Sequence, residues 1–186
     1  MGKKLSEMTL EELWQLFPIC LTEHQSLWYE WYAKEEGLLK NDLSSHVRIS
    51  HIGSTAISSI WAKPIVDILV EIPKGSQLLD YKALIINSGY ICMSQSENRL
   101  SFNKGYTENG FAERVFHLHL RYAGDNDELY FRDYLIEFPE AAREYEKLKL
   151  SLWKEYEHNR DAYTNAKAEL VKKYTKQARM KYGNRY

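Results

Sequence analysis

Residues that could bind phosphate gather in one short stretch of the chain, residues 51–71. Gly53, Ser54 and Thr55 follow a β-like segment. A turn of this composition leaves backbone N–H groups and hydroxyls free to contact a phosphate at close range. Lys63 adds a positive charge nearby in the sequence. Together these residues predict a phosphate-binding turn.

An acidic residue stands in the most apolar segment, residues 65–72, which predicts a strand. Because side chains alternate along a strand, Asp67, Leu69 and Glu71 share one face. A carboxylate there is unfavourable unless a metal, a base or a hydrogen-bond donor meets it. Asp67 is therefore the leading catalytic and metal-ligating candidate. The alternative is that Asp67 caps a neighbouring backbone group and Glu71 marks the solvated end of the strand.

Three histidines could complete a metal site with Asp67. His117 and His119 alternate along a later predicted strand, residues 114–122, and therefore face the same way, whereas His51 ends an earlier one. If these strands are adjacent, His51 and one or both of His117 and His119 converge on Asp67. Imidazoles with one carboxylate suit Zn²⁺, Mn²⁺ or Fe²⁺ better than Mg²⁺. Two other uses stay open: a histidine acting as a general base, or one paired structurally with Asp67.

Two further basic residues are candidates for phosphate contacts. Arg99 and Lys104 lie in or beside a predicted strand, residues 99–103. Arg99 would bind a phosphate through a forked contact and Lys104 as a point charge. The alternative is that both are solvated surface residues.

Several motifs occur in a fixed order along the chain. They are His51-Ile-Gly-Ser-Thr-Ala, Ala62-Lys-Pro-Ile-Val-Asp-Ile, His117-Leu-His119, Phe131-Arg-Asp-Tyr-Leu, Pro139-Glu-Ala, Tyr145 and Leu148-Lys149. In this order they resemble the GrpB family and, more broadly, the nucleotidyltransferase superfamily. The resemblance covers the chain from about the second predicted helix onward. It implies a nucleotidyltransferase-like fold, a mixed twisted sheet flanked by helices.

The metal site that the resemblance implies fits this sequence only in part. Nucleotidyltransferases hold Mg²⁺ with two acids separated by one residue and a third acid on a later strand. Asp67 fits the first position, but Leu69 fills the second, and His117 and His119 stand where the third acid is expected. Glu71 remains an acidic candidate, although it lies about 13 Å from Asp67 along an extended strand.

Two functions therefore stay open. In the first, the protein binds a nucleotide or phosphorylated small molecule and transfers a nucleotidyl group, with a nucleoside triphosphate as substrate and Mg²⁺, Mn²⁺ or Zn²⁺ as cofactor. In the second, it is a non-catalytic nucleotide- or ligand-binding module that has lost the paired metal-binding acids.

The predicted elements indicate an α+β protein with α/β-like character and one GrpB-like domain, residues 1–186. The sheet-containing core spans about 20–124 and a helical C-terminal segment about 125–186. Helices are predicted at 130–138, 140–158 and 161–182.

Capping boxes predict two helices near the N-terminus. The first begins with Thr9 and Glu12, and the second begins with Thr22 and Gln25 and ends near Gly37.

The amino-acid composition limits the kinds of binding partner that we expect. The chain has 186 residues, 44% of them hydrophobic, and a formal charge of −1, which supplies a core but no overall basic field. This charge argues against a nucleic-acid partner, and the basic last helix is interpreted as a solvated face. The alternatives for that helix are a contact with nucleic acid or with an acidic partner. The sequence has no apolar run of membrane-spanning length, no signal-peptide core and only two cysteines, so we expect a cytoplasmic protein without a membrane partner. The aromatic-rich helices leave room for a homodimer.

Overall fold

The structure, a computed structural model, describes residues 3–43 and 45–186. The strands are β1 (Arg48–Ile52), β2 (Val66–Ile72), β3 (Ile91–Gln95), β4 (Arg99–Thr107) and β5 (Gly110–Tyr122). The helices are η1 (Leu5–Glu7), α1 (Leu10–Leu16), α2 (Leu27–Asp42), η2 (Ser54–Ala56), α3 (Leu78–Asn87), α4 (Asp127–Glu137), α5 (Pro139–Glu155), α6 (Arg160–Ala166) and α7 (Ala168–Tyr182). Among the described residues, no helix combines the length and apolar character needed to cross a bilayer.

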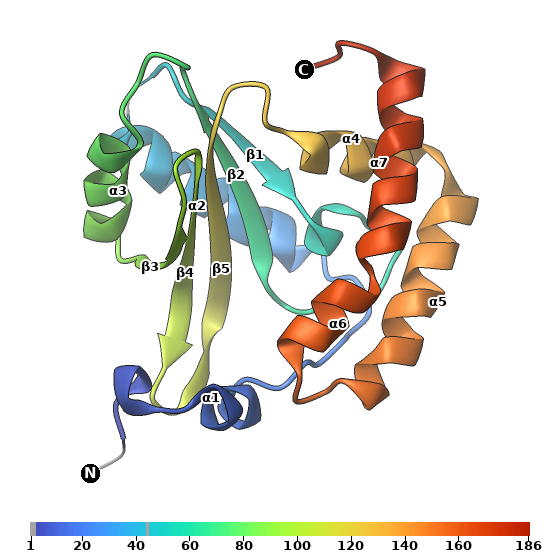
Figure 1. The fold of residues 1–186 in the computed structure, drawn as a ribbon, viewed down its shortest axis with the longest axis horizontal. Helices are drawn as coiled ribbons and strands as arrows, with labels where there is room; N and C mark the ends of the chain where they lie inside the picture. Colours follow the sequence, from blue (N-terminus) through green and yellow to red (C-terminus); the bar gives the residue numbers. More distant parts are fainter. Residues whose placement is uncertain (1–2, 44) are drawn as a thin grey trace.

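The strands form one mixed sheet in the order β1-β2-β5-β4-β3 (Figure 1). β2 and β5 pair in parallel, and the other neighbouring strands pair antiparallel. The parallel register places Asp67 opposite His117 and Leu69 opposite His119. The predicted α+β fold with a mixed sheet is therefore confirmed.

Alternation along β2 and β5 gives the sheet two different faces. The even-numbered side chains of β2, from Val66 to Ile72, are fully buried and pack with Trp28 and Trp31 of α2 in the main core. The odd-numbered side chains include Asp67 and both histidines, so the opposite face is polar. Burial of one apolar face drives the sheet onto α2 and α3 and leaves the polar face for the site.

The C-terminal helices form a layer of their own beside the sheet (Figure 1). α4, α5 and α7 share an apolar cluster with the segment after η2, built from Ile57, Ile60, Phe131, Leu135, Ala141, Ala142, Tyr145 and Tyr174. This packing holds the helices at a fixed position over the polar face and encloses space between the two layers.

The two predicted N-terminal capping boxes have different outcomes. Thr9 Oγ1 accepts from the Glu12 backbone N at 3.2 Å and Glu12 Oε2 accepts from the Thr9 backbone N at 2.7 Å, so the first box is confirmed. The second box is wrong: Thr22 pairs with Ala62 in an isolated bridge, and α2 begins five residues later. Gly37 lies inside α2 because the helix runs on to Asp42.

Three other predicted elements, two strands and a helix, differ from the structure in extent. The strands predicted at 99–103 and 114–122 are longer and form a continuous hairpin that turns between Thr107 and Gly110. The helix predicted at 161–182 is divided at Lys167 into α6 and α7. The break turns the chain so that Lys167 lines a cavity.

Candidate functional site

The site begins at the turn that follows β1. Gly53 has a φ of +71°, a conformation that L side chains rarely adopt. A Cβ at this position would lie 2.3 Å from Asp67 Oδ2. Two independent features therefore require glycine at position 53: the positive φ of the backbone and the close approach of the Asp67 carboxylate.

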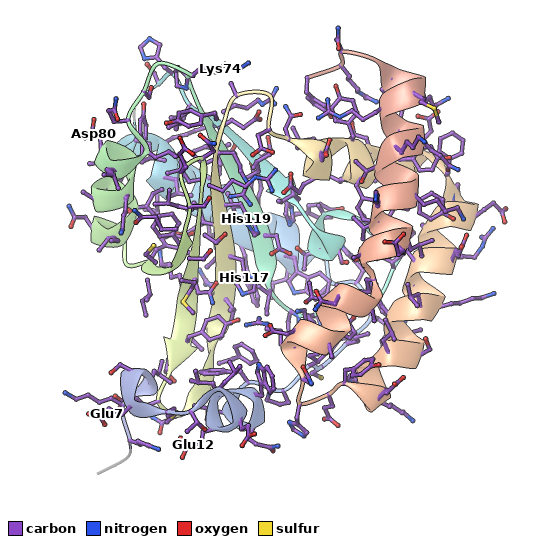
Figure 2. The ribbon with its side chains drawn as sticks, in the orientation of Figure 1. Glu7, Glu12, Lys74, Asp80, His117 and His119 are labelled. Carbon is purple, nitrogen blue, oxygen red and sulfur yellow. The ribbon has the colours of Figure 1, made fainter. Side chains whose placement is uncertain are left out.

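Asp67 is shared by two imidazoles from β5. Its Oδ1 lies 3.3 Å from His117 Nδ1 and 3.7 Å from His119 Nε2. Figure 2 shows both histidines along β5, one above the other. The other ring nitrogen of each histidine faces a hydrogen-bond donor. His117 Nε2 is 2.8 Å from the Tyr106 hydroxyl and 3.4 Å from Arg160 Nη2, and His119 Nδ1 is 3.4 Å from Arg121 Nη2. Because a guanidinium only donates, we assign the imidazole protons to the nitrogens that face Asp67.

This arrangement holds Asp67 ionised and His117 neutral. Burial alone would raise the pKa of the Asp67 carboxyl, but the hydrogen bonds from His117 and His119 outweigh burial and hold that pKa far below its ordinary value. Burial lowers the pKa of His117, and the charges of Arg160 and Lys63 lower it further, although Asp67 opposes this shift. The negative charge of the site therefore stays on Asp67.

A cavity of about 200 Å³, here called the inner cavity, adjoins Asp67 and His117. The Gly53–Thr55 turn forms one wall. Lys63, Lys149 and Lys167 also line it, together with Leu21, Ile65, Tyr145 and Tyr163. Asp67 is the one carboxylate among the described lining residues. The inner cavity is therefore a cationic space with room for a small anion.

The three lysines repel one another and are partly removed from water. Burial lowers the pKa of Lys63 to about 7, and the charges of Arg160 and Lys167 add to the shift. Burial also lowers the pKa of Lys149 to about 7 and that of Lys167 to about 8. Within residues 3–43 and 45–186, none of the three amino groups forms an ion pair.

Two hydroxyls of the inner cavity could contact a bound anion. Lys149 Nζ donates to Ser54 Oγ at 3.1 Å and to the Trp61 carbonyl, so Ser54 keeps its own O–H for another acceptor. The Tyr163 hydroxyl is buried and has no hydrogen-bond partner in the described part of the chain. The Tyr163 hydroxyl is therefore available to a group bound in the inner cavity.

A second, more open space of about 750 Å³, here called the outer groove, lies on the other side of Asp67. Gly53, Asp67 and Tyr145 line both spaces. The groove is also lined by His119 and by charged residues of both signs: Arg121, Asp127, Glu128, Lys172, Lys176 and Arg179. The basic last helix, interpreted from sequence as a solvated face, therefore contributes to this groove.

The predicted metal site does not fit the residues present. Within the described ranges, no three His, Cys, Asp or Glu side chains are placed to hold one ion. The second acidic position is Leu69, which is fully buried. His117 and His119 direct protons at Asp67 where a metal needs lone pairs. We therefore derive no chemistry through a metal at this site.

His51 is not part of the site, although its strand is adjacent to β2 as expected. The β1–β2 register pairs Ile52 with Asp67 and His51 with Ile68, which puts His51 on the opposite face. Its ring stacks on Tyr32 at 4.7 Å, and burial lowers its pKa to about 4. The expected convergence of His51 with Asp67 is therefore wrong.

Glu71 is also separate from Asp67, and its role is structural in this fold. Its buried carboxylate accepts from Arg48 Nε at 2.5 Å, from the Gly124 backbone N at 3.1 Å and from Asn126 Nδ2 at 2.9 Å. These contacts join β1, β2 and the loop before α4. Neither space described above includes Glu71 in its lining.

The structure places Arg99 and Lys104 away from the Gly53–Thr55 turn. Arg99 is exposed and forms a two-pronged ion pair with Asp125, at 2.7 and 2.6 Å. Lys104 lies on the α2 side of the sheet, where its Nζ donates to Glu35 Oε1 at 2.7 Å. Both therefore already have carboxylate partners outside the inner cavity.

Sequence reasoning gave no functional role to Lys149 and Lys167, which line the inner cavity. The position of Lys149 could have been noticed in the sequence, because it continues the apolar stripe of Ala141, Ala142 and Tyr145 on α5. A lysine on the buried face of a helix is unusual and indicates a special role. Lys167 carried no such signal, because its position depends on the break between α6 and α7.

The fold and the site define the class of protein. The structure resembles the crystal structure of the Cid1 poly(U) polymerase with MgGTP bound, with a TM-score of 0.51 and 12% identity over 69% of this chain and 42% of that one. This likeness concerns the fold alone, which is nucleotidyltransferase-like. The model of the GrpB protein family matches residues 18–177. The chain therefore belongs to the GrpB family, as its motifs predict.

Two relatives support the same assignment. The crystal structure of the conserved protein GrpB from Enterococcus faecalis matches with a TM-score of 0.74 and 30% identity, over 88% of this chain and 99% of that chain. The glutamate-rich protein GrpB of Alkalihalophilus pseudofirmus is 34% identical over 161 residues, which is 82% of this chain and 91% of the relative.

Proposed function

We propose that this protein binds the phosphate groups of a nucleotide or another phosphorylated small molecule in the inner cavity. The observation that carries the proposal is the charge of this space. Lys63, Lys149 and Lys167 line it, and Asp67 alone opposes them among the described lining residues. Lysine ammonium groups that are partly removed from water and have no carboxylate partner are unfavourable, and a bound phosphate supplies the missing negative charge.

Each lining group has a defined contribution in this proposal. The lysines neutralise the phosphate, and Ser54 and Tyr163 donate hydrogen bonds from their hydroxyls. Gly53 lets the chain turn closely past Asp67. Asp67 binds no phosphate; it fixes His117 and balances part of the positive charge.

Calorimetric titration tests the proposal. The ligands are ATP, AMP, inorganic triphosphate and inorganic phosphate, in a buffer that contains EDTA. Lys63→Met should weaken binding by about tenfold or more, because it removes one charge-assisted contact worth about 1.5–3 kcal/mol. Lys173→Met is the matched control, since Lys173 is an exposed lysine of α7 that pairs with Glu144. If none of the four ligands binds the wild type, the proposal fails.

Transfer of the bound group is a second candidate function, favoured by the position of Asp67 on both spaces. A hydroxyl of an acceptor in the outer groove would attack a phosphorus atom held in the inner cavity. A new P–O bond forms, the bond to pyrophosphate breaks and the hydroxyl proton passes to water. Pyrophosphate release from the four nucleoside triphosphates, with a small-molecule cell extract as acceptor source, tests this candidate. Release equal to that of Asp67→Asn would contradict transfer and leave binding intact.

A further inference from the structure

The position next to Asp67 that would hold a second metal-binding acid is apolar. Leu69 is fully buried and packs with Ile52 and Leu129 in a small cluster of its own. The strand opposite offers His119 at this level of the sheet. In the described residues, therefore, Asp67 has no neighbouring carboxylate with which to bridge metal ions.

The two oxygens of Asp67 have different surroundings. Oδ1 faces ring nitrogens of His117 and His119, at 3.3 and 3.7 Å, and Oδ2 lies against Gly53. Arg160 and Arg121 stand behind the two imidazoles and fix their protons toward Asp67. A cation at Asp67 would displace these protons and lie among groups that already carry positive charge.

In the inner cavity, the positive charge that would neutralise a phosphate comes from side chains. Lys63, Lys149 and Lys167 line the inner cavity, and Arg160 adjoins it through its contacts with Tyr106 and His117. In enzymes of phosphoryl transfer, metal ions bridge the phosphate oxygens and neutralise their charge. The four cationic side chains occupy that role in this site.

We propose that the inner cavity selects phosphate groups that carry no bound Mg²⁺, so that magnesium ions compete with the protein for the ligand. The inference rests on the proposed function. Chelation removes two negative charges from the phosphate and occupies the oxygens that the lysines would contact. The ligand class that follows is a phosphate monoester or another phosphorylated molecule that chelates Mg²⁺ weakly.

The test compares ATP, which chelates Mg²⁺ strongly, with AMP, which does so weakly. Calorimetric titrations of the wild type are run in EDTA and at an Mg²⁺ concentration that complexes about 99% of the ATP. Because only the free fraction binds, the apparent Kd for ATP should rise about 100-fold, and that for AMP should change little. A matching ionic strength, set with NaCl, separates chelation from screening.

The outcomes separate this inference from the proposed function. Binding of ATP that is unchanged or strengthened by Mg²⁺ overturns the selection against magnesium and leaves phosphate binding intact. The absence of binding by ATP, AMP, inorganic triphosphate and inorganic phosphate, with and without Mg²⁺, overturns the proposed function and this inference with it.

A second readout needs no nucleotide. Mn²⁺ alone is titrated into the wild type while the ring resonances of His117 and His119 are followed by NMR. We expect no selective paramagnetic broadening of these two histidines relative to His158, which is distant in the sequence and exposed. Selective broadening of His117 and His119 would place a metal at Asp67 and overturn the inference.

Discussion

Asp67 and His117 face each other across the parallel register of β2 and β5, with 3.3 Å between Oδ1 and Nδ1. The register fixes this pair, because the same alternation that buries the even-numbered side chains turns both residues to the polar face. Arg160, on the far side of the imidazole, orients its proton toward the carboxylate. Histidines therefore contact the acid of the site, and the lysines beside it have no carboxylate partner among the described residues.

Gly53→Ala tests the close approach of the turn to Asp67. The added Cβ would lie 2.3 Å from Oδ2 at a φ of +71°, so we expect a loss of about 2 kcal/mol or more in unfolding free energy. The free energy is measured by urea unfolding, together with the affinity for phosphate. Gly37→Ala is the control: nothing lies within 4 Å and the residue is helical, so this variant should gain up to about 1 kcal/mol. Equal stability of the two variants would contradict the geometry of the turn.

Lys63 should reduce the stability of the ligand-free protein near neutral pH. Its pKa is about 7 when folded against 10.5 as the ordinary value, so the unfolded chain binds more protons between these pH values. Stability then rises with pH across this window, and the penalty is full below pH 7. Lys63→Met should therefore be more stable than the wild type at pH 6.5, by a margin that shrinks towards pH 10. A margin independent of pH, in parallel unfolding curves, would contradict the lowered pKa.

Binding of an anion should depend on pH in the opposite sense. Sulfate keeps its charge across the range, so only the protein titrates. As the pH rises from 6 to 9 through the pKa values of Lys63, Lys149 and Lys167, the lysines lose charge and sulfate affinity should fall. At pH 8 binding should take up protons, which buffers of different ionisation enthalpy reveal in the calorimeter. Proton release, or affinity that rises with pH, would argue against lysine-held anions.

Glu71 should matter for stability and not for the ligand. Glu71→Ala leaves the Gly124 backbone N–H and the fully buried Asn126 amide without their acceptor, at a cost of about 1–3 kcal/mol. Thermal unfolding measures this loss. Phosphate affinity, measured well below the transition, should stay within about twofold of the wild type. If Glu71→Ala bound phosphate tenfold more weakly and unfolded at the same temperature as the wild type, Glu71 would belong to the binding site.

The predictable parts of this molecule are those with local causes. The apolar run of β2 and the glycine turn before it are stretches of consecutive residues, so the turn at Gly53 and the position of Asp67 on β2 could be predicted from sequence. The motifs in their fixed order predicted the GrpB family and, with it, the nucleotidyltransferase-like fold. The pairing of His117 and His119 with Asp67 followed from strand alternation.

The remaining parts depend on register and on distant segments. Adjacent strands were expected to bring His51 to Asp67, but an antiparallel offset of one residue reverses the face of a side chain. Lys149 reaches Ser54 from 95 residues away, through packing of α5 that no local pattern specifies. Arg99 pairs with Asp125 and Lys104 with Glu35. These partners are distant in the sequence, so only the fold shows that they are close.

The central claim is that a phosphate binds among the inner lysines, and NMR of the lysine side chains tests it most directly. Inorganic triphosphate is titrated in EDTA while the ε-CH₂ signals are followed against pH. We predict that Lys63, Lys149 and Lys167 shift together and that their pKa values rise on binding. Shifts confined to exposed lysines such as Lys172 and Lys176 of the outer groove would contradict the claim.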